Sequence, residues 1–352
     1  MTTEELNRYN RHIILPEIGL EGQEKLKQAK VLVIGAGGLG CPVLQYLVAA
    51  GVGDIGIVDD DKVDESNLQR QILYTTNDVG KPKAQVAVEK LSAQNPNCQF
   101  KSYLQRLNSG NALEIISDYD IVVDGSDNFP TRYLVNDACV MLNKPLVFGS
   151  VFKFEGQVAV FNYNGSATYR CLYPQPPSSD EVPNCSEIGV LGVLPGTVGL
   201  LQATEVIKII TGIGEVLSNK LLRFDALNMT FETFSFSLNP KNQEIKAFTD
   251  YEQFCGVAVK EISAEQLKEK LRLHEEMQII DVRESEEYAV KNIGAILIPL
   301  GTLADNLDKI NPNVPIIVHC QGGGRSKKAA QLLMEKGFTN VVSLKGGMRE
   351  YN

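Results

Sequence analysis

Apolar runs alternate with amphipathic helical patterns along most of the chain from Lys30 onward. Each run is continuously apolar, which predicts a strand that is covered on both faces. Four such runs are Val31–Ile34, Ile55–Val58, Ile121–Val123 and Leu146–Phe148. Helical patterns separate them, and the first of these patterns ends at Ala50. This order is typical of a doubly wound α/β fold with a mostly parallel sheet.

Beyond Gly156 the pattern changes, and we predict antiparallel strands that extend the same domain. These strands are expected over Val158–Phe161, Lys220–Phe224 and Thr230–Ser237. A polar, turn-rich stretch follows and predicts a linker over residues 241–258. The first domain is therefore expected to occupy residues 1–240.

A second α/β pattern occupies residues 259–352, and about ninety residues suffice for a small independent domain. Ser263 is a good N-cap for a helix over Glu265–Leu273. The other predicted elements are a helix over Arg325–Lys336 and strands over Met277–Val282, Pro315–His319 and Val341–Leu344.

Length and composition agree with two folded domains and narrow the choice of partners. The chain has 352 residues, and division by the roughly 150 residues of an average domain gives two domains. Its 34 basic and 43 acidic side chains give a formal charge of −9. A net negative charge does not suit a protein that binds nucleic acid or anionic lipid over a broad surface. We therefore expect small molecules or proteins as partners.

The cysteines and apolar segments indicate a cytoplasmic protein. The seven cysteines are odd in number and never spaced as Cys-x-x-Cys, as expected for reduced thiols. Residues 1–11 are polar and carry no secretory signal. The stretch Ile188–Ile207 is apolar with Glu205 as its only charge, but Pro195 and several glycines favour a buried loop and helix over a membrane span.

A glycine-rich turn follows the first predicted strand and opens a helix. It reads Gly35-Ala-Gly37-Gly38-Leu-Gly40, and Asp59 ends the next predicted strand. Glycines let a backbone approach phosphates at a helix N-terminus, and the carboxylate accepts hydrogen bonds from a ribose. On its own this pattern predicts a Rossmann-like nucleotide site, with NAD as the default ligand.

Further motifs favour nucleotidyl transfer over hydride transfer. Arg70 and Lys83 add two cations, and the segment Asp124-Gly-Ser-Asp127-Asn128 adds two carboxylates. Nucleotidyl transfer needs cations on the phosphate oxygens and a carboxylate that holds Mg²⁺, whereas hydride transfer needs neither. Solvated surface charges are the alternative for Arg70 and Lys83, and a turn cap is the alternative for Asp124.

The segments RYNRHIIL, GAGGLG, NLQRQ, GKPK, DGSDN and NCSEIGVLG together resemble the MoeB/ThiF family, bacterial relatives of ubiquitin-activating enzymes, over about residues 4–237. The resemblance implies that the chain adenylates the C-terminal glycine of a small ubiquitin-like sulfur carrier protein. It further implies that Arg11 reaches the nucleotide of a neighbouring subunit, and hence a homodimer. The resemblance also implies that Asp127 binds Mg²⁺ and that Arg70 and Lys83 neutralise phosphate charge. The implied ATP-binding residues are Gly38, Asp59, Ser66, Asn67, Leu68, Gln69, Arg70, Lys83, Asp127 and Asn128.

The cysteines of this domain differ from the family pattern in one respect. Many relatives hold a structural zinc with two Cys-x-x-Cys pairs, but here the segments read Thr168-Tyr-Arg-Cys171 and Asn242-Gln-Glu-Ile245, so we expect no zinc. Cys185 lies where relatives carry a cysteine that takes the activated glycine, and we predict that role, with an inert loop thiol as the alternative. The thiols predicted to be small core residues are Cys41, Cys98 and Cys139, whereas Cys171 and Cys255 have no predicted role.

The segment Cys320-Gln-Gly-Gly-Gly-Arg325-Ser326 joins a predicted strand to a predicted helix. Its backbone N–H groups are expected to form an anion cradle that stabilises a thiolate, and then a persulfide, on Cys320, and Arg325 would add positive charge. The spacing from Cys320 to Arg325 is one residue shorter than in cysteine phosphatases, which leaves room for a sulfur atom rather than a phosphate. We expect the glycine-rich loop to expose the thiol.

Together with Asp281-Val-Arg283-Glu284 and Leu344-Lys-Gly-Gly347-Met, this loop resembles rhodanese-type sulfurtransferases over about residues 259–352. Asp281 and Arg283 are predicted to form a structural ion pair or to brace the active loop. The usual histidine-containing segment of that family is shortened here to Lys291-Asn-Ile-Gly-Ala295, and Asn292 has no predicted role.

The two resemblances predict sequential chemistry on one chain. ATP would activate the C-terminal Gly-Gly of a sulfur carrier, and the Cys320 persulfide would then supply sulfur to form a carrier thiocarboxylate. The carrier is expected to be MoaD-like, for molybdopterin, with a ThiS-like carrier for thiamine as the alternative. Two alternatives belong to other functional classes. One is an NAD-dependent oxidoreductase with an appended domain, and in the other the rhodanese-like portion is a docking module without catalysis.

Overall fold

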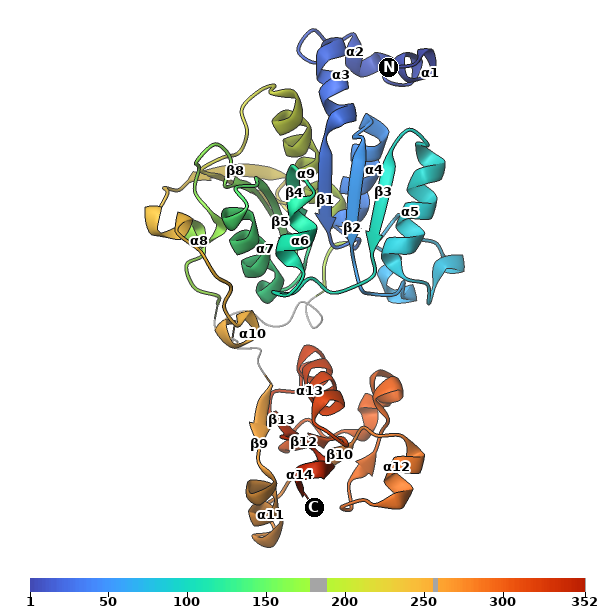
Figure 1. Ribbon diagram of the computed structural model, residues 1–352, viewed down its shortest axis with the longest axis vertical. Helices are drawn as coiled ribbons and strands as arrows, with labels where there is room; N and C mark the ends of the chain where they lie inside the picture. The colour runs from blue at the N-terminus through green and yellow to red at the C-terminus, as the bar shows by residue number, and fades with distance from the viewer. Residues whose placement is uncertain (178–188, 256–258, 352) are drawn as a thin grey trace. The chain divides into compact units, whose positions relative to one another are not determined.

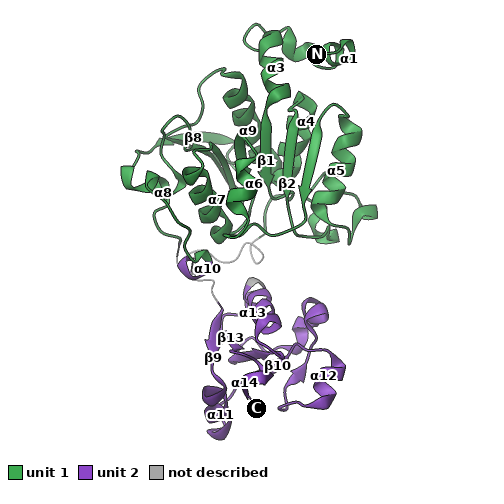
Figure 2. Cartoon of the chain, viewed as in Figure 1, with its two compact units in different colours: residues 1–176, 189–251 green, residues 177–188, 252–352 purple. Residues whose placement is uncertain are grey.

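The computed structural model describes residues 1–177, 189–255 and 259–351, which form two compact units (Figures 1 and 2). The larger unit comprises residues 1–176 and 189–251, and the smaller one includes residues 252–255 and 259–351. This division lies inside the segment for which the sequence predicts a linker. The domain limits 1–240, 241–258 and 259–352 remain predictions.

The larger unit contains an eight-stranded sheet in the order β3-β2-β1-β4-β5-β6-β7-β8. The first five strands run parallel and the last three are antiparallel to their neighbours, which confirms the predicted doubly wound sheet with an antiparallel extension. The strands are β1 (Lys30–Ile34), β2 (Asp54–Val58), β3 (Gln99–Tyr103), β4 (Ile121–Asp124), β5 (Leu146–Phe152), β6 (Glu155–Phe161), β7 (Lys220–Asp225) and β8 (Thr230–Ser235).

Helices cover both faces of this sheet (Figure 1). One layer contains α3 (Gly19–Gln28), α4 (Gly40–Ala50), α5 (Lys83–Gln94) and α9 (Val193–Thr211). The other contains α6 (Ala112–Ser117) and α7 (Phe129–Met141), with α8 (Tyr169–Leu172) packed on α7. Shorter elements are α1 (Thr3–Arg8), α2 (Asn10–Ile13), α10 (Tyr251–Phe254) and the 3₁₀ turns η1 (Glu65–Asn67), η2 (Thr76–Asp78) and η3 (Pro240–Gln243).

The core explains why the apolar runs predicted the strands. Val31 and Val33 of β1 are fully buried among residues of α4 and α5, and Leu32 between them is equally buried. A strand that is covered on both faces has no reason to alternate in polarity. By contrast β3, which the sequence analysis did not predict, lies at the sheet edge, and only Phe100 and Tyr103 of its side chains are partly buried.

The apolar stretch that raised the membrane question forms α9. It is the one helix, within the described ranges, that is long and apolar enough to cross a membrane. However, α9 packs against α3, α4, β5 and β6. Its buried Glu205 accepts hydrogen bonds from Lys208 Nζ at 2.6 Å and from the Leu217 N–H at 2.8 Å. These contacts are those of a core helix.

The smaller unit contains a five-stranded parallel sheet in the order β11-β10-β12-β13-β9. Its strands are β9 (Lys260–Ile262), β10 (Gln278–Asp281), β11 (Ile296–Leu297), β12 (Ile316–His319) and β13 (Val341–Leu344). Helix α13 (Gly324–Glu335) and η4 (Leu300–Lys309) pack on one face, and α11 (Ala264–Arg272) and α14 (Met348–Tyr351) pack on the other. Helix α12 (Ser285–Val290) connects β10 to β11. Ser263 caps α11 as predicted, accepting a hydrogen bond from the Gln266 N–H.

Candidate functional site

The glycine turn after β1 and the carboxylate after β2 are joined directly. Asp59 Oδ2 accepts a hydrogen bond from the Ala36 N–H at 2.7 Å, and its Oδ1 accepts one from the Asp61 N–H at 2.9 Å. Burial raises the pKa of the Asp59 carboxyl, and the charge of Lys83 acts against that rise. At the other end of the turn, a Cβ on Gly40 would lie 1.9 Å from the Gly35 oxygen, so the backbone can close here only with glycine.

Asp61 holds the Lys83 side chain at the edge of the sheet where the glycine turn lies. The Lys83 side chain is almost fully buried, and its Nζ lies 3.0 Å from Asp61 Oδ2. The Lys83 N–H also donates to the Asp61 oxygen, which fixes the start of α5 beside the residues that follow β2. A buried ammonium group is costly without an anion, so this lysine is held at the site rather than solvated at the surface.

The segment Ser66–Gln71 crosses the glycine turn. Arg70 Nη1 donates to the Ser66 oxygen at 3.2 Å, and Arg70 Cγ lies 3.6 Å from the position of a Cβ on Gly38. The start of α9 packs against the same segment and the glycine turn. A Cβ on Gly192 would lie 2.4 Å from Gln69 Oε1, and Pro195 lies 3.0 Å from the corresponding position on Gly38.

The loop after β4 meets the glycine turn from the neighbouring strand. A Cβ on Gly35 would lie 2.8 Å from the Gly125 oxygen. Asp124 is buried, and its Oδ1 accepts a hydrogen bond from the Ser126 N–H at 2.9 Å, so Asp124 caps the turn. Asn128 Oδ1 accepts from the Thr131 N–H at 3.0 Å and thereby caps α7, whereas Asp127 is exposed.

Arg11 lies apart from these residues within one chain. Figure 1 shows α2, which carries Arg11, at the end of the unit where β1 begins, whereas the glycine turn follows the end of β1. The other predicted site residues lie on loops that follow the neighbouring parallel strands β1, β2 and β4 and at the start of α5. They are Gly38, Asp59, Ser66, Asn67, Leu68, Gln69, Arg70, Lys83, Asp127 and Asn128. A role for Arg11 at the nucleotide of a second subunit stays a prediction.

In the smaller unit, Cys320 follows β12 at the bottom of the predicted loop. The Ser326 N–H donates to Cys320 Sγ at 3.3 Å, and the Ser326 hydroxyl lies 3.6 Å from the sulfur. Burial would raise the pKa of the Cys320 thiol, but hydrogen bonding with the Ser326 hydroxyl and with the N–H groups of Ser326, Gly322 and Gly323 outweighs burial and lowers the pKa. The loop therefore favours a thiolate.

The expectation that this loop exposes the thiol is wrong. Cys320 is only 1% exposed. A second glycine segment packs directly against the loop, since a Cβ on Gly347 would lie 2.2 Å from the Cys320 oxygen. The Met348 N–H donates to that oxygen at 2.8 Å, and the Arg349 N–H donates to the Gln321 oxygen at 3.1 Å.

Asp281 and Arg283 form the predicted ion pair and also brace the loop. Arg283 Nη2 lies 2.6 Å from Asp281 Oδ2, and both side chains are buried. Arg283 Nη1 donates to Gln321 Oε1 at 3.3 Å, and its Nη2 donates to the Lys291 oxygen at 2.6 Å. His319 is fully buried beside Asp281, and burial lowers its pKa, so the ring is neutral at pH 7.

The guanidinium of Arg325 is not available to the Cys320 sulfur alone. Its two terminal nitrogens donate to Glu287 Oε1 and Oε2, each at 2.7 Å. This pairing lowers the pKa of Glu287 to about 2, so the pair is ionised at neutral pH. Glu287 therefore neutralises much of the positive charge that the sequence analysis expected Arg325 to supply at Cys320.

Comparison with known proteins agrees with this geometry. Residues 9–247 match the ThiF family, and residues 263–352 match the rhodanese-like domain. The probable adenylyltransferase/sulfurtransferase MoeZ of Mycobacterium tuberculosis is 44% identical over 99% of this chain and 93% of its own length. The chain belongs to the ThiF family. As a ThiF-family chain with a rhodanese-like domain, it is an adenylyltransferase with a sulfurtransferase part.

Two further proteins match a smaller share of this chain. The sulfur carrier protein adenylyltransferase of Thermus thermophilus is 55% identical over 73% of this chain and 98% of its own length. The crystal structure of Escherichia coli MccB with ATP matches with a TM-score of 0.59 and 25% identity, covering 66% of this chain and 73% of MccB. Both agree with the predicted fold, and the ThiF family confirms the resemblance stated from the motifs.

Sequence reasoning missed several residues of this ThiF-family chain. Glu287 lies in the rhodanese-like part, where Gly347 belonged to a predicted motif but its contact with the Cys320 loop was not predicted. Gln71 lies beneath the glycine turn, where its Nε2 is 3.5 Å from the position of a Cβ on Gly37. Gln71 Oε1 is buried and has no hydrogen-bond partner in the described part of the chain. The only sequence signal for Gln71 was its place in the NLQRQ motif.

The cysteines divide as follows. Cys185 lies outside the described residues. Burial raises the pKa of Cys41 to about 12 and that of Cys98 to about 11, as expected for core thiols. Cys139 is fully buried as well.

Cys171 lies in one of the two segments that the sequence analysis compared with a zinc-binding pattern. Its Sγ accepts hydrogen bonds from the Thr168 N–H at 3.4 Å, the Asn239 N–H at 3.3 Å and Asn242 Nδ2 at 3.5 Å. Burial would raise the pKa of this thiol, but these hydrogen bonds lower it. Polar contacts of Cys171 with Asn239 and Asn242 thus join these two segments.

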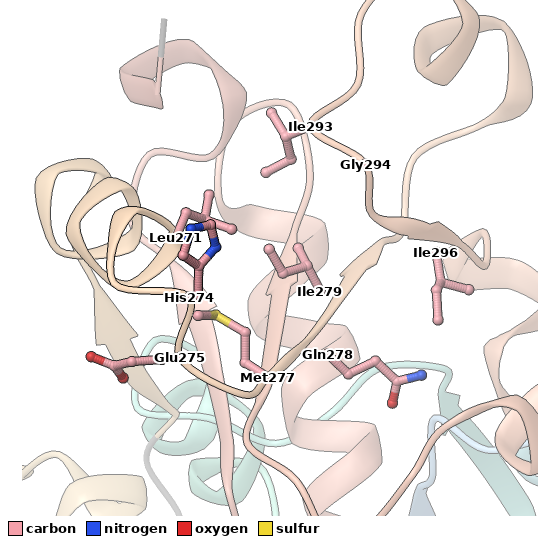
Figure 3. A pocket seen from close by; sticks show the side chains of 9 residues that line it. All are labelled: Leu271, His274, Glu275, Met277, Gln278, Ile279, Ile293, Gly294 and Ile296. Atoms are coloured by element: carbon pink, nitrogen blue, oxygen red, sulfur yellow. The ribbon is translucent and has the colours of Figure 1, made fainter.

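One pocket, of about 440 Å³, opens at the opposite end of the smaller sheet from Cys320. Figure 3 shows the residues that line it, among them Leu271, Met277 and Ile293, and they are mostly apolar. Its walls come from the end of α11 and the start of β10, whereas Cys320 follows the carboxyl end of β12, which runs parallel to β10. The pocket is therefore separate from the sulfur site.

Proposed function

We propose that this chain activates the C-terminal glycine of a ubiquitin-like sulfur carrier protein with ATP and then transfers sulfur to it from a persulfide on Cys320. The proposal assigns adenylylation to residues 1–240 and sulfur transfer to residues 259–352, joined by the linker 241–258. The observation that carries it is the hydrogen bonding of Cys320 Sγ, because donors from Ser326, Gly322 and Gly323 suit an anionic sulfur. Such a sulfur is the nucleophile that an activated acyl group requires.

The nucleotide site fits ATP as substrate. The close approach of Gly35 and Gly40 lets the backbone turn tightly at the start of α4, and phosphates bind at helix N-termini of this kind. Arg70 and Lys83 would neutralise the charge that develops on the phosphate oxygens, and Asp59 would accept hydrogen bonds from the ribose. The alternative of an NAD-dependent oxidoreductase has no counterpart among the adenylyltransferases that this chain resembles over almost its whole length.

Mg²⁺ also fits this site, although with a single protein ligand. Within the described ranges, no three His, Cys, Asp or Glu side chains lie close enough together to hold a metal on their own. Mg²⁺ commonly binds one or two carboxylates together with substrate phosphates, so Asp127 is sufficient as the protein's contribution. When bound, the ion would offset the negative charge of the triphosphate.

The first step needs no general base. The C-terminal carboxylate of the carrier is already an anion, and its oxygen attacks the α-phosphorus of ATP while pyrophosphate leaves with the bonding electron pair. The product is an acyl-adenylate. Positioning and charge neutralisation by Arg70 and Lys83 are then the main contributions of the protein.

The second step joins sulfur to the activated glycine. The terminal sulfur of the Cys320 persulfide attacks the acyl carbon, and AMP leaves with the electron pair of the broken C–O bond. The resulting acyl-persulfide is cleaved when a second thiolate attacks Cys320 Sγ, which releases the carrier thiocarboxylate and leaves a disulfide on the enzyme. Cys185 is proposed as that thiol, or as the thiol that holds the glycine.

The carrier is proposed to be MoaD-like, with a ThiS-like carrier as the second candidate. Both branches use the same chemistry, so the purified protein should be offered each carrier with ATP, and the products weighed by mass spectrometry. We also propose a cytoplasmic homodimer in which Arg11 serves the nucleotide of the neighbouring subunit.

The test of the two-site proposal is Cys320→Ala. This variant should keep carrier-dependent ATP–pyrophosphate exchange and lose thiosulfate:cyanide sulfur transfer. Cys171→Ser is the matched control, because this thiol is only part-buried and belongs to neither site, and it should keep both activities. Loss of both activities in Cys320→Ala would refute the division of labour.

A further inference from the structure

The RYNRH segment near the N-terminus contains two arginines whose side chains have different surroundings. Arg8 Nη1 donates a hydrogen bond to the Gln94 oxygen at 3.1 Å. The Arg11 side chain is exposed, and it makes no hydrogen bond or ion pair among the residues that the structure describes. Arg11 is therefore available to a group outside its own chain, whereas Arg8 is engaged within it.

Tyr9, two positions before Arg11, is anchored at the carboxyl end of α4. Tyr9 is 5% exposed, and a Cβ on Gly51 would lie 2.5 Å from its Cζ, so the ring packs directly on the residue that caps α4. The Tyr9 hydroxyl accepts a hydrogen bond from Asn95 Nδ2 at 2.8 Å, and the same nitrogen donates to the Val48 oxygen at 2.7 Å. Because Asn95 is fully buried, these two bonds fix both the carboxamide and the ring.

His12, the residue after Arg11, is anchored at the same end of α4. Gln23 of α3 is fully buried, and its Nε2 donates to the Ala50 oxygen at 2.7 Å. That bond turns Gln23 Oε1 toward His12 Nδ1, 3.2 Å away, so the ring nitrogen is the donor. Ala50 is the last residue of α4. A buried carboxamide therefore holds each of the two rings that flank Arg11.

This anchorage places Arg11 far from the glycine turn of its own chain. Helix α4 begins at Gly40, beside that turn, and ends at Ala50, so its eleven residues span about 16 Å. The N-terminal arm, defined as α1 and α2 (residues 3–13), is fixed at the far end of this helix, beyond the start of β1 (Figure 1). An arginine side chain is shorter than that span. Held there, Arg11 is placed for a nucleotide in another subunit rather than for its own.

We propose that Tyr9 and His12 are positioning residues for nucleotidyl transfer, which hold the N-terminal arm so that Arg11 presents its charge to the nucleotide of the neighbouring subunit. This inference rests on the proposed function in taking Arg11 as a cation that acts across a homodimer. A fixed arm leaves only the Arg11 side chain to be ordered when the nucleotide binds, whereas a loose arm adds the cost of ordering its backbone. Such positioning raises the rate although neither ring contacts the substrate.

The test uses mixed dimers in which only one nucleotide site can work. One subunit, the arginine subunit, carries Lys83→Met, which disables its own site and leaves its Arg11. The other, the nucleotide subunit, carries Arg11→Ala and keeps its own site. Two different affinity tags select the mixed dimer after coexpression. ATP–pyrophosphate exchange, measured with MoaD-like and ThiS-like carriers in parallel, then reports the single composite site.

His12→Leu in the arginine subunit should lower this exchange about tenfold, because a displacement of about 1 Å at a reacting group can cost up to about a hundredfold in rate. The same substitution in the nucleotide subunit should leave the exchange almost unchanged, since the arm of that subunit carries no arginine at position 11. His12→Asn in the arginine subunit should keep most of the exchange, because asparagine retains a hydrogen-bond donor close to the position of Nδ1.

A second variant and a second measurement separate positioning from folding. Tyr9→Phe in the arginine subunit keeps the ring and removes only its hydroxyl, and it should lower the exchange several-fold. Tyr46→Phe in the same subunit is the matched control and should have no effect, because Tyr46 is 57% exposed. In homodimers of Tyr9→Phe and of His12→Leu, the amides of residues 1–15 should exchange with deuterium faster than in the parent protein, with those of β1 and β4 unchanged.

Three outcomes would overturn the assignment. Equal losses from His12→Leu in the arginine subunit and in the nucleotide subunit would show that the ring only stabilises the fold. Unchanged exchange in both placements would show that the arm needs no such anchor. A mixed dimer without further substitutions that is no faster than the two homodimers would contradict the action of Arg11 across subunits, which distinguishes failure of the proposed function from failure of this inference.

Discussion

The Tyr251 hydroxyl donates a hydrogen bond of 2.7 Å to Asp137 Oδ2, which joins two residues 114 positions apart. Asp137 is buried in α7, and it also accepts two hydrogen bonds of 2.7 Å from Arg170 and one of 2.9 Å from Asn136. One carboxylate therefore ties α8 and α10 to α7. Its charge is satisfied by Arg170 and by neutral donors, as a buried ion requires.

Removal of that hydroxyl should destabilise the larger unit. In Tyr251→Phe a buried carboxylate oxygen loses a donor, so the free energy of unfolding should fall by about 1–2 kcal/mol. The thermal transition of this unit should then move down by about 3–6 °C. Tyr46→Phe is the control, because Tyr46 is 57% exposed. Equal melting temperatures for the two variants would contradict the structural role of the Tyr251 hydrogen bond.

Ser326→Ala should shift the pH dependence of sulfur loading. The Ser326 hydroxyl lowers the pKa of Cys320, so its removal raises that pKa and leaves less thiolate at pH 7. The acid limb of the rate of Cys320 alkylation by iodoacetamide should move to higher pH, and the rates should converge at alkaline pH.

Ser343→Ala provides the comparison for that shift. Ser343 Oγ lies 2.8 Å from Ser326 Oγ but makes no hydrogen bond to the sulfur among the described contacts. Its substitution should move the acid limb less than Ser326→Ala does. A larger shift in Ser343→Ala would mean that the hydroxyl pair, rather than Ser326 alone, sets the thiolate population.

Gly347→Ala should disable the sulfur site without abolishing adenylylation. Gly347 has φ +60°, and a Cβ there would lie 2.2 Å from the Cys320 oxygen, so the loop must move. A displacement of about 1 Å at a catalytic group can cost about a hundredfold in rate. We expect a loss of that size in thiosulfate:cyanide transfer.

Gly301→Ala is the matched substitution, because a Cβ there meets no atom within 4 Å. This variant should retain thiosulfate:cyanide transfer within about twofold. Carrier-dependent ATP–pyrophosphate exchange should be unaffected in both glycine variants, and circular dichroism should show that both fold. Full sulfur transfer by Gly347→Ala would show that the loop tolerates the displacement.

Lys83→Met should remove most of the nucleotidyl transfer. Its buried ammonium group lies at the glycine-turn edge beside Asp61, and loss of one preorganised donor of this kind typically costs a hundredfold or more. ATP–pyrophosphate exchange should fall at least about a hundredfold, with thiosulfate:cyanide transfer unchanged. Lys81→Met, whose side chain is 55% exposed, should exchange normally. Similar losses in both variants would point to the general charge of the segment rather than to Lys83.

Much of the fold and of the nucleotide site follows from local sequence. The runs around Val33, Ile57 and Val123 are buried on both faces, so their composition alone distinguishes them from helices and loops. The strands that escaped prediction, β3, β9 and β11, are short or lie at sheet edges, where few side chains are buried and the apolar signal is weak.

The sequence by itself also determined the two chemical motifs, because the glycine turn around Gly38 and the loop from Cys320 to Arg325 are continuous in the chain. Tertiary structure alone decided how the charges in them are used. Glu287 reaches Arg325 from 38 residues away, and Gly347 packs against the Cys320 backbone from a different loop. Ion pairs and burial depend on what the fold brings together, and no local pattern encodes a partner so distant in sequence.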